Sequence, residues 1–272
     1  MWHYRETGTG RPLVLLRGLG MSHAAWAAVT PSLSSRRRVI AFDTAGFGST
    51  PPLPNGVLPT VSNLVDGLCE SIREMGLSVP VDMAGNSLGG WMALEAATRG
   101  IARTVVAISP AGLWRECPPV HVQYVLKGMR FAARHLTGTL KAAVETPWGR
   151  ECAFAVPLSV GSRRMPACDA RRAVDDLAMC PAFDETFEHT RSPFPGGDII
   201  VPVTVAFGDR DWILPRWSRC RAALPPHTRW TEPRGWGHVP MWADPAGVSR
   251  LILDGTSGSC ESRNRPQRSP NR

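Results

Sequence analysis

Residues 79–91 read VPVDMAGNSLGGW, and this stretch predicts a strand, a tight turn and a helix in direct succession. The run 79–84 is short, apolar and partly β-branched, as buried parallel strands are. From Leu88 onward helix-forming residues dominate up to Gly100, which can end the helix in a left-handed conformation. Residues 85–89, GNSLG, match G-x-S-x-G. In this turn a strained serine exposes its hydroxyl, and the flanking glycines avoid backbone collisions.

A serine hydroxyl becomes a nucleophile only when a base removes its proton, and the base needs an acid to orient it. His238 is the best candidate for the base that serves Ser87. It lies in residues 235–240, GWGHVP, a glycine-flanked loop between an expected strand and the last helix. The other six histidines of the chain lack this setting.

The acid is expected between the serine and the histidine, in the chain order Ser, acid, His. Residues 208–211, GDRD, directly follow the apolar run 201–207. We assign Asp211 as the acid that orients the histidine. Asp209 is its structural neighbour and can accept backbone amides of the turn. The alternative is that both aspartates only shape the turn. Asp244 is expected to cap the final helix, with Pro245 at its first position.

Together these segments resemble the α/β-hydrolase superfamily from Leu13 to about Leu253. Four segments carry the resemblance: the GNSLG turn, the GDRD turn, the GWGHVP loop and residues 43–50. Residues 43–50 read DTAGFGST and resemble the pattern D-x-x-G-x-G-x-S of the superfamily. The resemblance implies a Ser–His–Asp triad formed by Ser87, His238 and Asp211. Cleavage of an ester-like carbonyl is then expected to pass through an acyl-enzyme.

Acyl transfer also needs backbone donors for the oxyanion that forms. The amide of Leu88 follows the nucleophile, and the resemblance implies the amide of Leu19 as the second donor. Most relatives have His-Gly where this chain has Arg17-Gly18. A backbone donor survives that change, and Arg17 is expected to pair with a nearby acid or to meet a carboxylate of the substrate.

The alternation of strands and helices predicts a mostly parallel central sheet flanked by helices, the α/β-hydrolase fold. The expected strands are 2–6, 13–16, 38–42, 79–84, 104–108, 201–207 and 228–232, and the expected core helices are 60–75, 88–100 and 245–253. Ligands bind such sheets beyond the carboxyl ends of the strands, so the site residues should converge there. Only one strand fits before Leu13, where the superfamily usually has two. The sheet is therefore expected to lack its first strand, unless the start codon is placed late.

Four segments are expected along the chain. Residues 1–112 and 198–254 form the two parts of the core, and residues 255–272 form a polar, disordered tail. Between the core parts, residues 113–197 break the strand–helix alternation and carry expected helices over 121–136, 169–179 and 182–189. This insertion resembles the helical cap that covers the active site in many α/β-hydrolases.

Composition indicates a globular protein, because 43% of the 272 residues are hydrophobic and 20% are charged. No stretch approaches the roughly 20 apolar residues of a membrane span, and the first residues lack a secretory signal. The seven cysteines are scattered without C-x-x-C spacing. That usage fits a cytoplasmic protein without a disulfide framework or a zinc site.

The net charge of +8 does not indicate nucleic-acid binding. Part of the charge lies in arginines of the last residues and in Arg36 to Arg38, and no basic helix with interleaved aromatic residues is present. The chain also lacks a P-loop, a dinucleotide fingerprint and metal-ligand spacing of its histidines. We therefore expect no cofactor, no metal and no nucleic-acid partner.

The expected substrate is a small molecule with an apolar acyl or aromatic group, contacted by Arg17, Asn86 and Trp114. Two alternatives stay open. The form GNSLGG with Asn86 also resembles hydrolases that cleave carbon–carbon bonds of ring-fission diketones, although those enzymes usually have Trp where Val239 stands. The fold could also serve a ligand-binding protein of low turnover. Dehalogenases and epoxide hydrolases of this superfamily carry Asp at the nucleophile position, so Ser87 argues against both.

Overall fold

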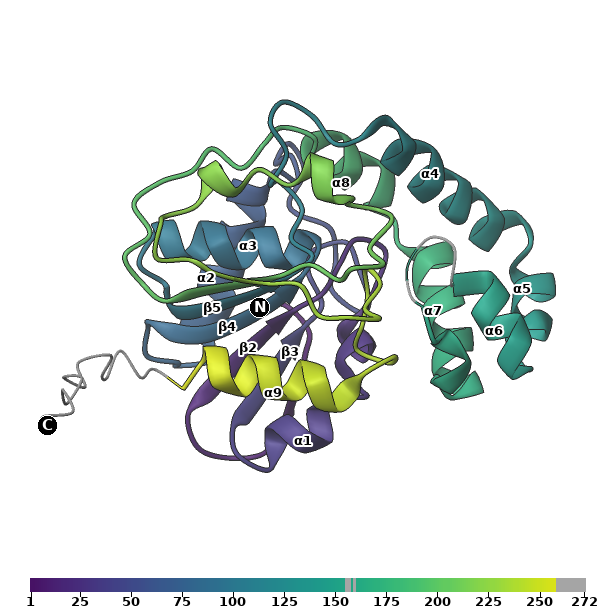
Figure 1. The fold of residues 1–272 in the computed structure, drawn as a ribbon, viewed down its shortest axis with the longest axis horizontal. Coiled ribbons are helices and arrows are strands. Elements are labelled where there is room, and N and C mark those ends of the chain that lie inside the picture. The colour runs from purple at the N-terminus through teal and green to yellow at the C-terminus, as the bar shows by residue number, and fades with distance from the viewer. Residues whose placement is uncertain (155–157, 159, 258–272) are drawn as a thin grey trace, which may run out of the picture.

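The computed structural model of the protein describes residues 1–154, 158 and 160–257, and its core is a sheet covered by helices on both faces (Figure 1). The strands are β1 (Tyr4–Thr7), β2 (Pro12–Leu16), β3 (Arg38–Phe42), β4 (Val81–Asn86), β5 (Ala102–Ile108), β6 (Val203–Ala206) and β7 (Arg229–Thr231). The core helices are the 3₁₀ helix η1 (His23–Trp26), α1 (Thr30–Ser34), α2 (Val61–Glu74), α3 (Leu88–Thr98) and α9 (Pro245–Gly255).

The strands lie in the order β1-β3-β2-β4-β5-β6-β7. β1 pairs with β3 antiparallel, and the other neighbouring pairs are parallel. The predicted fold class, a mostly parallel sheet flanked by helices, is therefore confirmed. Each parallel strand ends at the same edge of the sheet, which brings the loops after β2, β4, β6 and β7 together.

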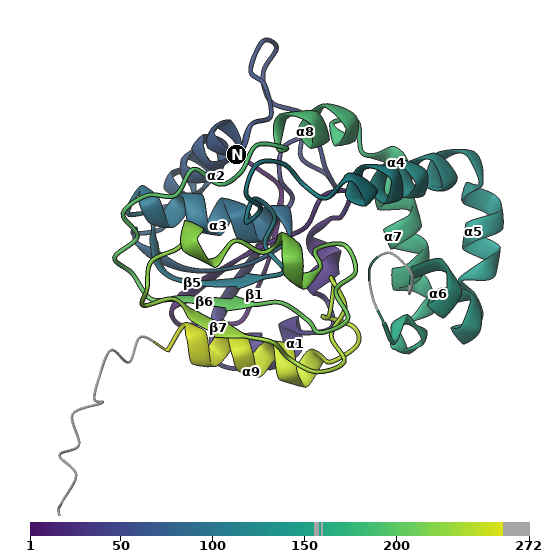
Figure 2. The same ribbon diagram turned by 45° about the horizontal axis from the view of Figure 1, so that its top comes forward.

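Helices α2 and α3 cover one face of the sheet, and α1 and α9 cover the other (Figures 1 and 2). In α2 the buried apolar residues recur at helical spacing, and Thr60 caps the helix by accepting the amide of Asn63 at 3.2 Å. Asp244 caps α9 as predicted, accepting the amide of Gly247 at 2.9 Å. The caps fix where these helices begin, and hence where the preceding loops end.

The segment between β5 and β6 carries α4 (Val120–His135), α5 (Thr137–Ala143), α6 (Pro147–Phe154), η2 (Ser162–Arg164), α7 (Ala167–Met179) and α8 (Phe183–His189). Three of these helices match the predicted ones to within two residues, whereas α5 and α6 were not predicted. Helices α4 to α7 stand together at one side of the core, and α8 lies closer to α3 (Figure 2). Two 3₁₀ turns, η3 (Arg216–Ser218) and η4 (Arg221–Ala223), separate β6 from β7.

The expected start of a disordered tail at residue 255 is wrong by a few residues. Gly255 ends α9, and Thr256 is buried, with its hydroxyl accepting a hydrogen bond from Arg37 at 2.9 Å. This anchor holds the chain against the core beyond the last apolar turn of the helix. The rest of the expected tail, residues 258–272, lies outside the described residues.

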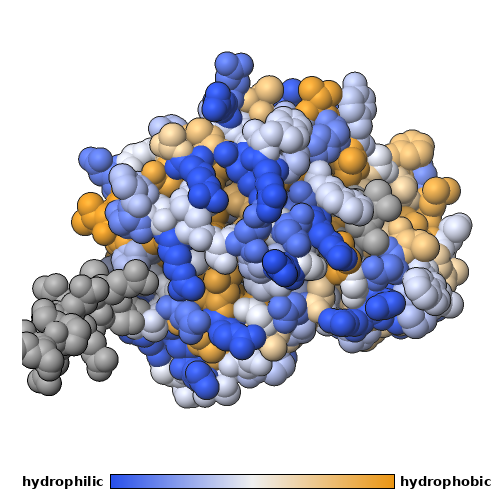
Figure 3. All heavy atoms as spheres, in the orientation of Figure 1, coloured by the Kyte–Doolittle hydropathy of each residue, from blue (hydrophilic) through white to orange (hydrophobic). Residues whose placement is uncertain are grey.

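The surface of the face in Figure 3 alternates between hydrophilic and hydrophobic side chains, so no single apolar area dominates it. Within the described chain, no helix is both long enough and apolar enough to cross a membrane.

Candidate active site

Ser87 occupies the turn between β4 and α3 in a conformation that is rare for a residue with a side chain, with φ 53° and ψ −115°. Its amide donates to the carbonyl of Ile108 at 3.0 Å, which ties the turn to β5. The flanking glycines are required because a side chain at either position would collide with neighbouring backbone. A Cβ on Gly85 would lie 2.1 Å from the carbonyl oxygen of Gly89, and a Cβ on Gly89 would lie 2.2 Å from that of Leu16. The strained turn expected from the sequence is thus present.

His238 brings its imidazole to this serine from the loop after β7. Its Nε2 lies 2.9 Å from Ser87 Oγ, and its Nδ1 lies 3.0 and 3.1 Å from the two carboxylate oxygens of Asp211. His238 and Asp211 are both buried. The three side chains that the sequence singled out, from three distant loops, therefore form one hydrogen-bonded row.

Asp211 has the environment of a carboxylate that stays ionised. Burial alone would raise its pKa, but the contacts with His238, the amide of Leu214 and the Ser109 hydroxyl outweigh burial, so the pKa of Asp211 is lowered. The Leu214 amide donates to Oδ1 at 2.9 Å. A charged Asp211 favours the tautomer of His238 that carries its proton on Nδ1 and leaves Nε2 free to accept a proton.

Asp209 does not contact the histidine. Its carboxylate accepts the amide of Gly235 at 2.6 Å, so it joins the turn after β6 to the loop that carries His238. This contact is the one expected of a structural neighbour.

Asn86, expected to contact substrate, lines the pocket above Ser87 but is already engaged with the protein. Its side-chain amide donates to the carbonyl oxygens of His238 at 2.9 Å and Ile108 at 3.1 Å. Asn86 therefore holds the backbone of the histidine loop against the end of β5.

Leu19 and Leu88, whose amides are the expected oxyanion donors, line the same pocket as Ser87. The loop after β2 passes close to Ser87, because a Cβ on Gly18 would lie 3.3 Å from Ser87 Cβ. Both expected donors thus belong to segments beside the serine hydroxyl.

Arg17 is fully buried and does not line this pocket. One of its Nη atoms donates to the carbonyl of Gly18 at 2.8 Å, and its guanidinium stacks 3.8 Å above the ring of Phe47. Burial lowers its pKa to about 9. Arg17 makes no ion pair with an acid within the described chain, so the expected contacts with an acid or a substrate carboxylate find no support here.

The pocket over Ser87 is lined mainly by apolar side chains from the core loops and from α4 and α8. Besides Asn86, Ser87 and His238, its lining includes Leu19, Met21, Leu88, Trp114, Val122, Leu126, Leu158, Phe187, Thr190, Ile213, Leu214 and Val239. Trp114, the third expected substrate contact, is among them, and its indole N–H donates to the carbonyl of Arg191 at 3.0 Å. No Arg or Lys is found among the described residues that line the pocket.

The inserted helices contact the loop after β2 through a partly buried polar pair. The hydroxyl of Ser22 donates to the carboxylate of Asp176 on α7 at 2.5 Å, and Ser22 also caps η1. A second apolar pocket lies beside this pair, and it shares five of its described lining residues with the first: Leu19, Met21, Leu126, Leu158 and Val239. The insertion thus touches the segment that carries Leu19.

Ser109 is a site residue that the sequence reasoning missed. It follows β5 directly, has φ 45° and is fully buried, and its hydroxyl, which makes no hydrogen bond to any described residue, slightly lowers the pKa of Asp211. A polar residue immediately after a buried strand, at the carboxyl edge of the sheet, is the signal that could have identified it.

The sequence profile of the alpha/beta hydrolase family matches residues 13–251. This chain belongs to the alpha/beta hydrolase family. Among its curated relatives is the epoxide hydrolase EphH of Mycobacterium tuberculosis, to which this hydrolase is 31% identical over 216 residues, 72% of its own length and 95% of the relative's. Another is the 2-hydroxy-6-oxo-2,4-heptadienoate hydrolase of Pseudomonas putida, 41% identical over 97 residues, 35% of this chain and 34% of the relative.

Among solved structures, this hydrolase resembles that of a membrane phospholipase A described as a bacterial virulence factor. The TM-score is 0.72 and the identity 23%, with 94% of this chain and 83% of the other covered. At that identity the likeness concerns the fold alone.

Proposed function

We propose that this alpha/beta hydrolase is a serine esterase that cleaves a neutral, apolar ester through an acyl-enzyme. The observation that carries the proposal is the 2.9 Å contact between His238 Nε2 and Ser87 Oγ, with Asp211 behind the imidazole. A hydroxyl in hydrogen-bond contact with a buried imidazole, itself oriented by a carboxylate, is the arrangement that acyl transfer needs.

In the proposed reaction Ser87 Oγ attacks the carbonyl carbon of the ester while His238 Nε2 takes the hydroxyl proton. The amides of Leu19 and Leu88 stabilise the oxyanion, and His238 then gives its proton to the departing alcohol. In the second half, His238 Nε2 takes a proton from the water that attacks the carbonyl carbon of the acyl-enzyme. The bond from that carbon to Ser87 Oγ then breaks, His238 returns the proton to Ser87 Oγ, and the acid is released. Asp211 stays ionised throughout and stabilises the imidazolium.

The lining of the pocket supports a neutral substrate. Its polar groups are few, and the buried Arg17 stacks on Phe47 outside the lining. A substrate carboxylate would lose its hydration in this pocket without gaining a cationic partner, which is costly. The apolar lining therefore favours an ester over the acidic diketones that carbon–carbon bond hydrolases cleave.

Carbon–carbon bond cleavage is the second candidate. It is supported by the GNSLGG form of the turn around Ser87 and by the similarity to the heptadienoate hydrolase of Pseudomonas putida. An epoxide is included in the test because of the similarity to EphH, although the serine at position 87 argues against epoxide opening. A low-turnover ligand-binding protein with the same triad is the remaining alternative.

The test is a substrate panel on purified protein and on Ser87→Ala. Short and medium p-nitrophenyl esters, a vinylogous diketo acid and an aryl epoxide are compared by kcat/KM, and a fluorophosphonate probe reports the reactive serine. We expect ester turnover and labelling in the parent protein and neither in Ser87→Ala, with thermal unfolding unchanged. Ester turnover that survives in Ser87→Ala, or preferential cleavage of the diketo acid or epoxide, would overturn the proposal.

A further inference from the structure

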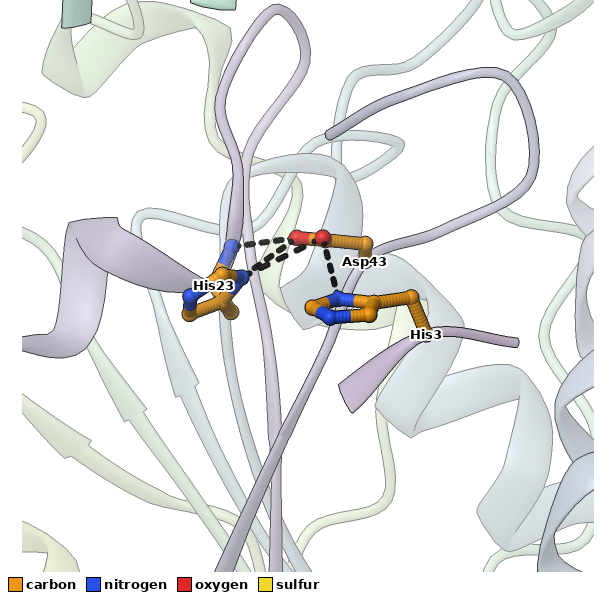
Figure 4. Close-up of side chains that lie close together, drawn as sticks. All are labelled: His3, His23 and Asp43. Carbon is orange, nitrogen blue, oxygen red and sulfur yellow. Dashed lines mark hydrogen bonds and ion pairs between the residues drawn. The ribbon is translucent and has the colours of Figure 1, made fainter. Parts of the chain in front are cut away.

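Three side chains far apart in sequence meet at a place outside both apolar pockets (Figure 4). Asp43 directly follows β3, His3 directly precedes β1, and His23 is the first residue of η1. The sheet register brings the first two together, because β1 and β3 are antiparallel neighbours and the Asp43 amide donates to the His3 carbonyl at 2.9 Å. His23 reaches the pair from the loop that also carries Leu19.

Both imidazoles present the same nitrogen to one carboxylate. His3 Nδ1 lies 2.9 Å from Asp43 Oδ2, and His23 Nδ1 lies 3.1 and 3.2 Å from the two carboxylate oxygens. The carboxylate also accepts the backbone amides of His23 at 2.6 Å and Ser49 at 3.0 Å. The two amides fix the orientation of the carboxylate independently of the imidazoles.

The burial of the three residues is graded from the core to the surface. The Asp43 side chain is 0% exposed, that of His23 is 23% and that of His3 is 43%. The cluster therefore combines a buried carboxylate with two imidazoles, one of which lies at the surface and gives access from solvent.

We propose that His3 Nδ1, His23 Nδ1 and the Asp43 carboxylate bind a divalent transition metal ion, with Zn²⁺ as the best match. Two imidazole nitrogens and one carboxylate suit Zn²⁺, whereas Mg²⁺ and Ca²⁺ prefer oxygen ligands alone. The ion replaces the hydrogens that the Nδ1 atoms share with the carboxylate. No described residue hydrogen-bonds Nε2 of either ring, so the proton can reside there in the metal-bound form.

The nitrogen–oxygen separations are close to what the ion requires, and all three ligand atoms lie within 4.8 Å of one another. Tetrahedral Zn²⁺ with bonds of about 2.0–2.2 Å places its ligand atoms roughly 3.3–3.5 Å apart. The present nitrogen–oxygen distances of 2.9 to 3.2 Å are a few tenths of an ångström shorter. A small rotation of the half-exposed His3 ring opens this space, and water completes the coordination.

The expectation of no metal site rested on spacing along the chain, which cannot detect ligands that only the fold brings together. The bound ion links the edge strand β1, the turn after β3 and η1. Because none of its ligands lines the pocket over Ser87, its role is to stabilise the fold rather than to take part in ester cleavage. An ion that binds only the folded chain raises the free energy of unfolding in proportion to the logarithm of its concentration.

The test uses the full chain, stripped with a chelator, and titrates it with Zn²⁺ by calorimetry and with Co²⁺ by visible absorption. We expect one ion per chain, tetrahedral Co²⁺ bands and a melting temperature that rises with Zn²⁺. His3→Gln and His23→Gln should each weaken binding at least about 100-fold, since the loss of even an outer hydrogen-bond partner costs about 10–100-fold. His135→Gln, an exposed histidine at the end of α4, is the matched control and should bind as the parent does.

Circular dichroism without metal verifies that each variant is folded. If one of the two histidine variants does not fold, the other still tests the proposal. Absence of saturable binding by the parent would overturn the proposal. Binding that both histidine variants retain would overturn it as well, because the ion would then be held elsewhere, for example by the free cysteines.

Discussion

The side-chain amide of Asn86 donates to the backbone carbonyl of His238 at 2.9 Å, so the residue before Ser87 also fixes the loop that carries His238. Its second hydrogen bond, to Ile108 at 3.1 Å, anchors this link to β5. Both acceptors are carbonyl oxygens, which makes the donor character of the Asn86 amide essential.

Asn86→Asp should therefore destabilise the protein. A carboxylate cannot donate, and it would face two buried carbonyl oxygens, so we expect the free energy of unfolding to fall by about 2–3 kcal/mol. Urea denaturation measures the change. Asn63→Asp is the control, because the Asn63 amide also donates to a carbonyl, that of Leu58, but at an exposed position, and less than about 0.5 kcal/mol is expected there. Equal losses in the two variants would contradict the assignment.

Asp211→Asn should separate catalysis from binding. The amide would donate to Nδ1 and leave the proton on Nε2, where it blocks transfer from Ser87. We expect kcat for a p-nitrophenyl ester to fall at least about 10³-fold with little change in KM. Asp209→Asn is the matched control, since an amide oxygen can still accept from Gly235, and kcat should stay within about an order of magnitude. A similar kcat in both variants would show that Asp211 does not orient the base.

Two glycine-to-alanine changes should act in opposite directions. In Gly89→Ala the new Cβ would collide with the backbone of Leu16, and because backbone atoms cannot yield cheaply, we expect a loss of at least about 4 kcal/mol or failure to fold. In Gly128→Ala, within α4, nothing lies within 4 Å of the new Cβ, and alanine should stabilise the helix by about 0.5–1 kcal/mol. Thermal melting of both variants tests the contrast, and a mild effect of Gly89→Ala would count against the tight turn.

Asp176→Asn should stabilise the protein at neutral pH. Burial raises the pKa of Asp176, so the folded state favours the protonated carboxyl, and the stability that this preference contributes is lost as pH rises through the raised pKa. An amide carries no charge to bury and still accepts from Ser22. The gain measured by urea unfolding at pH 7 should shrink as pH falls and vanish below about pH 3, where Asp176 is protonated in both the folded and the unfolded state.

Asp175→Asn serves as the control for this pH dependence. Asp175 is adjacent in sequence but pairs with Lys141 at the surface, 2.8 Å away, so its removal should change stability by less than about 1 kcal/mol and without a gain. An equal gain at both positions would mean that net charge, not burial of Asp176, is responsible.

The strands along the chain and the three residues of the proposed triad could be predicted because each depends on local sequence. The GNSLG turn, the GDRD turn and the GWGHVP loop each follow a recognisable apolar run, and parallel strands bring such loops to one edge. The observed bounds of β4 and the observed end of α9 differ from the predicted ones by two residues. Propensity along the chain does not include the pairing of β4 with β5, nor the contact that anchors Thr256 after α9.

The roles of Arg17 and Asn86 could not be predicted, since they depend on which partner the fold supplies. Stacking of Arg17 on Phe47, across the turn after β3, leaves no trace in the local pattern around either residue. The same holds for the meeting of His3, His23 and Asp43. Helices α5 and α6 were missed because they are short, interrupted by Gly138 and Gly149, and bury few residues.

The hydrogen bond from Ser22 to Asp176 makes the inserted helices and the backbone beside the nucleophile a single mechanical unit. Because Ser22 lies three residues after Leu19, any displacement of α7 that keeps this bond would also pull on the backbone of the proposed oxyanion donor. The position of α7 and the geometry beside Ser87 are therefore coupled.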